Sequence, residues 1–149
     1  DPLLDRAACK APKHVQHVRL EVGPEDVQDQ PEGEKSSIHN RPKEVCPLVA
    51  TLITDHLASL QLAGDDLSRL WLHQANRHMN DLIARRVLGH DPSPAQAPII
   101  LDRYANTSSA GSIIAFHLHR HDLPQGALGV VCSFGAGYSA GSVVVRRAS

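Results

Sequence analysis

Apolar residues in the last two-thirds of the chain switch repeatedly between two spacings, and this switching limits the possible folds more than any other feature. Over residues 45–60 apolar side chains recur every three or four positions, which is typical of one face of an amphipathic helix. Residues 70–72 form a short continuous apolar run, which is typical of a buried strand. Helical and strand patterns alternate from there to residue 147. This alternation predicts an α/β fold, in which a mixed sheet carries layers of helices on its faces.

Capping and turn residues indicate where the expected elements begin and end. Pro47 is expected in the first turn of the first helix, where a proline is tolerated. Asn76 is expected to cap a second helix, and Gly89 to end it in a left-handed conformation. The Ser- and Thr-rich turn 106–109 is expected to start a third helix that runs to about His121. The other expected elements are strands at 98–101, 128–134 and 142–147, the last two joined by the glycine-rich residues 135–141.

Length and charge narrow the class of protein. A chain of 149 residues is the common size of one domain, which we place at residues 43–149. Residues 1–42 are expected to be an irregular linker or remnant, because Pro, Gly, Glu, Gln and Lys dominate residues 23–35. The net charge of −1 gives no overall field that would attract nucleic acid or an anionic membrane. No apolar run approaches the roughly 20 residues of a membrane span, so we expect a cytoplasmic protein.

Cysteine and histidine patterns give little support to a metal site. Cys9, Cys46 and Cys132 are odd in number and far apart, so free thiols are expected rather than disulfides or a zinc ribbon. The string at 117–121 places two of its three histidines on one helix face but directs the third away. No neighbouring ligand completes a tetrahedral set. A histidine-rich metal-binding module remains only a weak alternative.

Three polar segments lie where predicted strands end, which is where open α/β sheets bind their ligands. His73 follows directly on the strand at 70–72. Asn106 lies in the turn 104–111, which is expected to lead from a strand into a helix. The glycine-rich loop 134–137 can direct backbone N–H groups at an oxygen atom, because few side chains block the approach. Each segment alone has a structural explanation, so the combination carries the interpretation.

Together the three segments resemble the C-terminal half of β-ketoacyl-acyl-carrier-protein synthase III. The resemblance rests on His-Gln-Ala-Asn at 73–76, Asp-Arg-Tyr-Ala-Asn-Thr-Ser at 102–108, and Phe-Gly-Ala-Gly at 134–137 with Gly141 after it. It covers residues 43–147 in unbroken order. It implies a thiolase-like layered fold, of which this chain would form the C-terminal half. It also implies an acyltransferase of fatty-acid synthesis that condenses an acyl thioester with a malonyl group on acyl carrier protein.

The resemblance implies a role for each segment. His73 and Asn106 would be catalytic, both donating N–H groups to the enolate oxygen that forms as the malonyl group loses carbon dioxide. His73 would therefore stay neutral and donate, rather than bind a metal. The backbone N–H of Ala136 would serve a second oxyanion hole, beside the N–H of the acylated cysteine. Phe134, Gly135 and Gly137 would line the substrate pocket.

The resemblance also implies partners. Acyl carrier protein would dock on a segment and a basic pair of the second helix, namely Gln74, Ala75, Asn76, Arg77, His78, Arg85 and Arg86. Coenzyme A or the carrier's phosphopantetheine arm would deliver the thioesters, with no metal or redox cofactor. The intact enzyme would be a homodimer. Two positions depart from the family pattern: Ala105 replaces the usual glycine before the asparagine, and His78 replaces a frequent arginine.

The nucleophilic cysteine is the part of the family pattern that the sequence does not supply. In the family this cysteine lies in the N-terminal half, well over 100 residues before the histidine. Cys9 lacks the small-residue turn and the upstream strand of the family's nucleophile segment, and residues 1–42 match the family poorly. The chain is therefore expected to carry two of the three catalytic residues. An inactive fragment, or a partner that binds carrier protein without turnover, remains the alternative.

Overall fold

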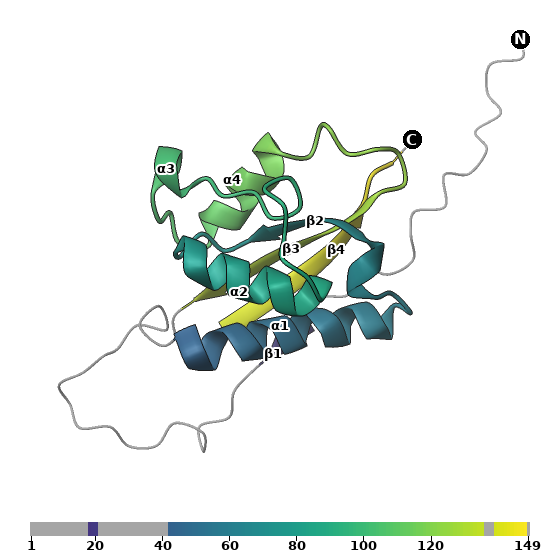
Figure 1. Cartoon of the computed structure of the whole chain (residues 1–149), viewed down its shortest axis with the longest axis horizontal. Helices are drawn as coiled ribbons and strands as arrows, with labels where there is room; N and C mark the ends of the chain where they lie inside the picture. The colour runs from purple at the N-terminus through teal and green to yellow at the C-terminus, as the bar shows by residue number, and fades with distance from the viewer. Residues whose placement is uncertain (1–17, 21–41, 136–138, 149) are drawn as a thin grey trace, which may run out of the picture.

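The computed structural model describes residues 18–20, 42–135 and 139–148. Four strands form one mixed sheet in the order β1-β4-β3-β2 (Figure 1). Their bounds are β1 Val18–Leu20, β2 Leu67–Leu72, β3 Leu128–Gly135 and β4 Ser139–Arg146. β2 and β3 run parallel, whereas β4 pairs antiparallel with β3 on one side and with β1 on the other. The mixed sheet expected from the sequence is confirmed.

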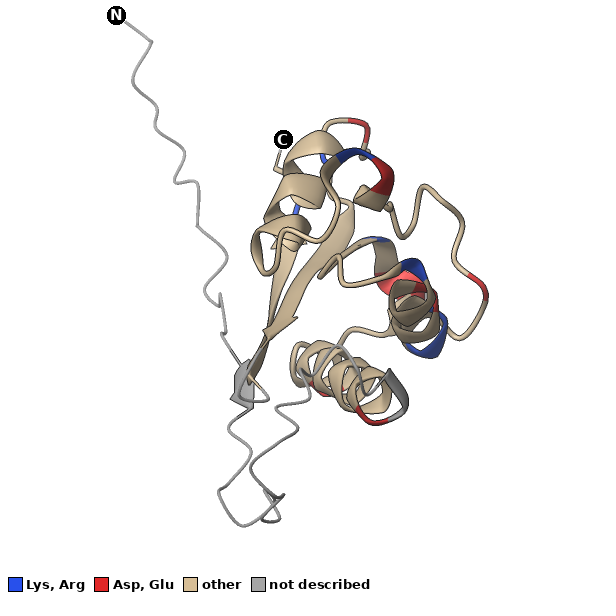
Figure 2. Ribbon diagram, turned by 90° about the vertical axis from the view of Figure 1, so that its left-hand side faces the viewer, with Lys and Arg blue, Asp and Glu red and all other residues tan. Residues whose placement is uncertain are grey.

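Helices cover both faces of this sheet, as Figure 2 shows nearly edge-on. Their bounds are α1 Pro42–Ser59, α2 Arg77–Leu88, α3 Leu101–Tyr104 and α4 Ala110–Leu118, with a short 3-10 helix η3 at Gly64–Asp66. α1 and α2 lie on one face, and α4 lies on the other (Figures 1 and 2). The parallel connection from β2 to β3 passes through α2, α3 and α4. Within the described ranges, none of the helices combines the length and apolar character that a membrane crossing requires.

Two apolar clusters hold the layers together. Between the sheet and the α1–α2 layer, Ile53, Leu70 and Ile83 are fully buried. On the opposite face, Trp71 packs edge-on against Phe116 of α4, with ring centroids 4.9 Å apart. Gly129 makes room for this indole, because a Cβ at that position would lie 2.3 Å from the Trp71 ring. Alternate residues of β2 thus belong to opposite layers, as the period of a strand requires.

The predicted ends of α2 are confirmed. The side chain of Asn76 accepts a hydrogen bond from the Met79 N–H at 2.9 Å, which satisfies a donor that the first helical turn leaves open. Gly89 follows the last turn with φ 76°, in the left-handed region that glycine tolerates. α2 therefore starts four residues after His73, at a position fixed by its own cap.

Several expectations about element boundaries were wrong. β2 begins at Leu67 rather than at Leu70. α1 begins at Pro42, so Pro47 lies in its second turn rather than its first. α4 ends at Leu118, three residues before His121. β4 begins at Ser139 rather than at residue 142, because its ladder with β3 continues through the pair Gly135↔Ser139.

The predicted strand at 98–101 is also wrong, and the reason matters for the site. Residues 98–100 adopt no regular structure, and Leu101 already belongs to α3. Their polar backbone groups bond to a side chain instead of a strand: the Ile100 N–H donates to Gln74 Oε1 at 3.0 Å. The turn 104–111 therefore leads from helix α3 into helix α4, not from a strand.

The N-terminal segment contributes one element that the sequence pattern did not indicate. β1 adds an antiparallel edge strand to β4 through the pairs Val18↔Ser142 to Leu20↔Ala140. Residues 1–17 and 21–41, the rest of the linker or remnant predicted at 1–42, lie outside the described residues, and Cys9 is among them.

Candidate active site

His73 lies where β2 ends, at the edge of the sheet where β3 also ends. The preceding residue, Leu72, pairs with Cys132 in the parallel ladder, which brings the end of β3 alongside. The imidazole is fully buried and lies on the ring of Phe134, with ring centroids 4.5 Å apart and a tilt of 44°. The first and third of the polar segments predicted from the sequence are therefore in direct contact.

Asn106 lies on an exposed turn between α3 and α4. Its carboxamide oxygen accepts a hydrogen bond from the Ser108 N–H at 2.9 Å. The amide nitrogen of Asn106 is therefore the atom that can donate to a ligand. The backbone on both sides is unusual: Ala105 has φ 53° and ψ −158°, and Ser108 has φ 58°. Positive φ at residues other than glycine costs energy and persists only where the surroundings impose it. The turn thus presents an oriented amide on a strained backbone.

A hollow of about 430 Å³ joins the Asn106 turn to the end of the β3–β4 hairpin. Its walls are Ser108, Ser109, Ser133, Phe134, Gly135, Ser139, Ala140 and Gly141. Phe134 thus contacts both His73 and the hollow. Gly135 leaves the strand end open, since no described heavy atom lies within 4 Å of the place a Cβ would take. Such a hollow has the size of a small-molecule site.

A hydrogen bond holds the second segment to β3, and close packing holds it to Gln74 of the first segment. The Ser133 hydroxyl of β3 donates to the Ser109 carbonyl at 3.1 Å and lies 2.5 Å from the Ser112 hydroxyl. On the other side, Gly111 approaches so closely that a Cβ there would lie 2.8 Å from Cβ of Gln74. The three polar segments are therefore connected: residues of the second and third line the hollow, and the first contacts them through His73–Phe134 and Gln74–Gly111.

The family is decided by a comparison with protein-family models. The model described as 3-Oxoacyl-[acyl-carrier-protein (ACP)] synthase III C terminal matches residues 57–147, which is more than half of the chain. The chain belongs to this family. The resemblance stated from the three motifs is confirmed, and each motif falls inside the matched range.

Curated relatives agree with the synthase III family. A beta-ketodecanoyl-[acyl-carrier-protein] synthase of Pseudomonas aeruginosa is 59% identical over 105 residues, which cover 70% of this chain and 30% of the relative. A beta-ketoacyl-[acyl-carrier-protein] synthase III of Porphyromonas gingivalis is 38% identical over 88 residues, covering 58% of this chain and 25% of the relative. The chain therefore spans about three tenths of the length of these relatives, or less.

Solved structures confirm the thiolase-like fold class. The 3-oxoacyl-(acyl carrier protein) synthase III of Pseudomonas aeruginosa superposes with a TM-score of 0.64 at 24% identity, covering 72% of this chain and 34% of that one. The synthase III of Thermus thermophilus gives a TM-score of 0.60 at 26% identity, covering 70% and 32%. The α/β layers of Figure 1 thus correspond to about one third of each of these structures.

The positions predicted to bind carrier protein are only partly on the surface. Arg77, His78, Arg85 and Arg86 are exposed on α2, and Figure 2 colours the arginine positions of its ribbon blue. Ala75 and Asn76 are half-buried. The Arg85 guanidinium forms an ion pair with Asp91. Gln74, in contrast, is fully buried and bonds to the interior.

The two described cysteines have the properties of structural thiols. Burial raises the pKa of the Cys132 thiol to about 12. Burial also raises the pKa of Cys46, and the nearby charge of Arg86 offsets this only in part. Since the thiolate is the nucleophilic form, neither side chain is prepared for acyl transfer near neutral pH.

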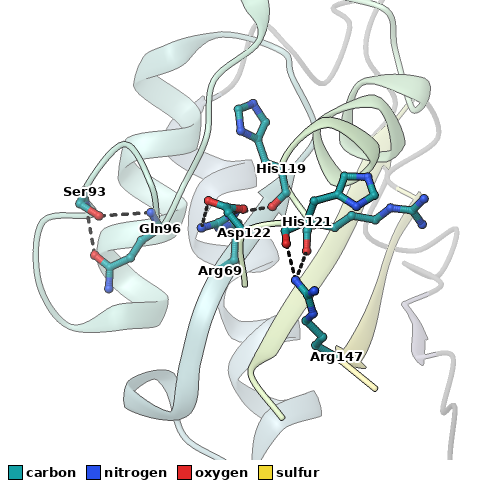
Figure 3. Close-up of polar contacts among 8 residues, drawn as sticks. Arg69, Ser93, Gln96, His119, His121, Asp122 and Arg147 are labelled. Atoms are coloured by element: carbon teal, nitrogen blue, oxygen red, sulfur yellow. Dashed lines mark hydrogen bonds and ion pairs between the residues drawn. The ribbon is translucent and has the colours of Figure 1, made fainter. Parts of the chain in front are cut away.

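Two histidines of the string at 117–121 form hydrogen bonds through their backbone carbonyls. The carbonyls of His119 and His121 accept hydrogen bonds from Arg69 and Arg147, and Arg69 also pairs with Asp122 (Figure 3). This pairing lowers the pKa of the Asp122 carboxyl, chiefly through the hydrogen bond from Arg69. Within the described residues, no three His, Cys, Asp or Glu side chains are placed to hold a metal ion.

Some site residues lie outside the described ranges, and others were not predicted. Ala136 and Gly137 are not described, so their proposed roles stay predictions. Ser133 was not singled out from the sequence. The alternation along residues 128–135 does place it on the face opposite Phe134, toward the serine-rich turn, and that signal could have identified it.

Proposed function

We propose that this chain supplies the C-terminal catalytic part of a β-ketoacyl-acyl-carrier-protein synthase III-type acyltransferase. The reaction is the decarboxylative condensation of an acyl thioester with malonyl-acyl carrier protein in fatty-acid biosynthesis. Family membership and the names of the relatives support this reaction class. The observation that carries the proposal is that Phe134, which contacts His73, lines one hollow together with Ser108 and Ser109 of the Asn106 turn.

The proposed chemistry needs donors that hold a developing oxyanion. The malonyl carboxylate leaves as carbon dioxide, and its bonding electrons pass into the thioester, which becomes an enolate. His73 and Asn106 would each donate an N–H to the enolate oxygen, and such donors are each worth on the order of 10²–10³ in rate when preorganised. Burial of the His73 imidazole and the hydrogen bond that the Asn106 amide oxygen accepts from Ser108 support this role, because the second leaves the amide nitrogen as the donor.

Carbon–carbon bond formation completes the reaction. The enolate carbon attacks an acyl group held as a thioester on a cysteine, and the cysteine leaves as a thiolate. The backbone N–H of Ala136 would hold the tetrahedral oxyanion, with Phe134, Gly135 and Gly137 lining the pocket. The raised pKa values of Cys46 and Cys132 favour a nucleophile from outside the described residues.

Acyl carrier protein is the proposed partner, and α2 is its proposed docking surface. The exposed residues Arg77, His78, Arg85 and Arg86, with Ala75 and Asn76 beside them, would meet the acidic carrier next to the end of β2. Buried Gln74 would contribute from beneath rather than by contact. Coenzyme A or phosphopantetheine thioesters would be the substrates, with no metal or redox cofactor. We further propose a homodimer and a cytoplasmic location for the intact enzyme.

A complementation assay tests the proposed reaction. The chain is combined with the separately expressed N-terminal part of the Pseudomonas aeruginosa relative, which is 59% identical over the shared region. Condensation of an acyl-coenzyme A with malonyl-carrier protein is expected from the mixture but from neither part alone. His73→Ala and Asn106→Ala should abolish it, whereas Ser93→Ala, in an exposed loop, should not. Full activity in the His73 or Asn106 variant would overturn the proposal.

The alternative is a chain that binds carrier protein without turnover, and the buried, high-pKa cysteines favour it. Under this alternative no N-terminal part restores condensation, yet labelled carrier protein still binds. Titrating the chain with carrier protein measures binding without any condensation step. It therefore distinguishes a binding partner from a condensing enzyme.

A further inference from the structure

Gln74 is a polar side chain in a fully buried position, directly after His73. Its amide nitrogen donates to the Leu72 carbonyl at 3.0 Å and to the Pro98 carbonyl at 3.4 Å. Its amide oxygen accepts the Ile100 N–H at 3.0 Å. Both N–H groups and the oxygen are thus used, which is what a buried amide requires.

These bonds connect two segments that are far apart in the sequence. Leu72 is the last residue of β2, whereas Ile100 is the residue before α3. Residues 98–100 have no strand partner for these groups, and the Gln74 amide takes that place. Gln74 therefore fixes where α3 begins relative to His73.

The segment that carries Asn106, residues 101–109, is here called the Asn106 arm. Gln74 holds its start through Ile100, while Ser133 holds its end through the Ser109 carbonyl and the Ser112 hydroxyl. Gly111 packs against the Gln74 side chain just beyond that end. The Asn106 arm is therefore fastened on both sides to the strands that carry His73 and Phe134.

Backbone strain inside the Asn106 arm indicates that these fastenings impose its shape. Ala105 and Ser108, on either side of Asn106, have φ of 53° and 58°. Strained residues persist only where the surrounding structure over-determines them. Two fixed ends supply that constraint.

We propose that Gln74 is a positioning residue, which sets the place of the Asn106 amide relative to the His73 imidazole, with Ser133 as the second fastening of the Asn106 arm. Neither side chain is proposed to touch the reacting atoms. The catalytic consequence rests on the proposed condensing activity, whereas the structural coupling does not. A displacement of about 1 Å at a catalytic group can cost on the order of 100-fold in rate.

The test compares Gln74→Met with Gln96→Met. Methionine keeps the length of the side chain and removes the three hydrogen bonds. Gln96 is a matched control, because its amide oxygen also accepts a backbone N–H, from Ser93 at 3.1 Å, in a loop outside the Asn106 arm (Figure 3). Ser133→Ala, with Ser93→Ala as its control, provides an independent pair if Gln74→Met does not fold.

Nuclear magnetic resonance of the chain itself gives a readout that needs no activity. Both Gln74→Met and Ser133→Ala should shift the side-chain amide signals of Asn106. Gln74→Met should also speed hydrogen exchange at the Ile100 N–H, and Ser133→Ala should speed it at the residues near Ser109. The control variants should leave these signals unchanged. Unmoved Asn106 amide signals in both folded test variants would overturn the proposal.

Kinetics of the assembled enzyme give the second readout. The kcat for condensation should fall about tenfold or more in Gln74→Met, with the KM for the malonyl thioester within about twofold of wild type. A purely structural role would instead lower the amount of folded protein and leave kcat per folded molecule unchanged, which would reject positioning. If wild-type protein shows no condensation, the proposed function fails, while the resonance shifts still decide the coupling.

Discussion

Replacing Ala105 with glycine should stabilise the protein, although the substitution removes a side chain. Ala105 has φ 53° and ψ −158°, a region of the backbone map that is close to one reserved for glycine. The Cβ of alanine is the source of the conflict, and glycine has none. Ala105 is exposed, so the loss of its methyl group removes little packing.

Two opposing contributions set the size of the effect. A residue in such a region carries strain of about 1–3 kcal/mol, which the substitution relieves. Glycine also increases the conformational entropy of the unfolded chain, which lowers the free energy of unfolding by about 0.4–1 kcal/mol. The net gain in the free energy of unfolding is about 1 kcal/mol, or a rise in Tm of about 2–4 °C for a chain of this size.

Urea and thermal unfolding of the whole chain measure this change. Ala58→Gly is the matched control: Ala58 is exposed within α1, where glycine should cost up to about 1 kcal/mol. The two substitutions are chemically identical and should move stability in opposite directions. Equal destabilisation by both would refute the reasoning, because it would show that Ala105 is not strained.

Three further predictions follow from single features of the structure. Asn76→Ala should lower the free energy of unfolding in urea by about 1 kcal/mol, since it removes the cap of α2, and an unchanged midpoint would argue against the cap. Burial raises the pKa of Cys132 to about 12, so above pH 9 the thiol ionises in the unfolded chain but keeps its proton in the folded one. The free energy of unfolding should therefore fall as the pH rises from about 9 to about 12. Cys132→Ala should flatten that slope, which is at most about 1.4 kcal/mol per pH unit, and identical slopes would contradict the assignment. Arg85→Glu combined with Arg86→Glu should weaken carrier-protein binding, most strongly at low salt, and an unaltered affinity would reject α2 as the docking surface.

The elements with strong periodicity and clear caps were predictable from the sequence. The helix after Asn76 and the strand before His73 were confirmed because their end signals and their apolar patterns agree. The positions of His73 and Phe134 at neighbouring strand ends followed from the general geometry of α/β sheets. Their contact needed only the parallel pairing of β2 with β3.

The features that were missed depend on tertiary contacts. The apolar run at 98–101 resembles a strand, yet its backbone partner is the Gln74 side chain, which no local pattern indicates. β1 has only three residues, too few to show a period. The alternation along β3 places Ser133 on the face opposite Phe134, but it does not identify its partner, which is a backbone carbonyl 24 positions away.

The release of carbon dioxide from a malonyl thioester tests most directly whether His73 and Asn106 act on one oxygen atom. The measurement uses the chain assembled with the N-terminal part of its Pseudomonas aeruginosa relative. Each single alanine variant should lose on the order of 10²–10³ in rate, and the double variant should lose less than the product of the two, because the donors share one oxyanion. Wild-type rates in either single variant, or losses that simply multiply, would contradict the convergence of these two side chains.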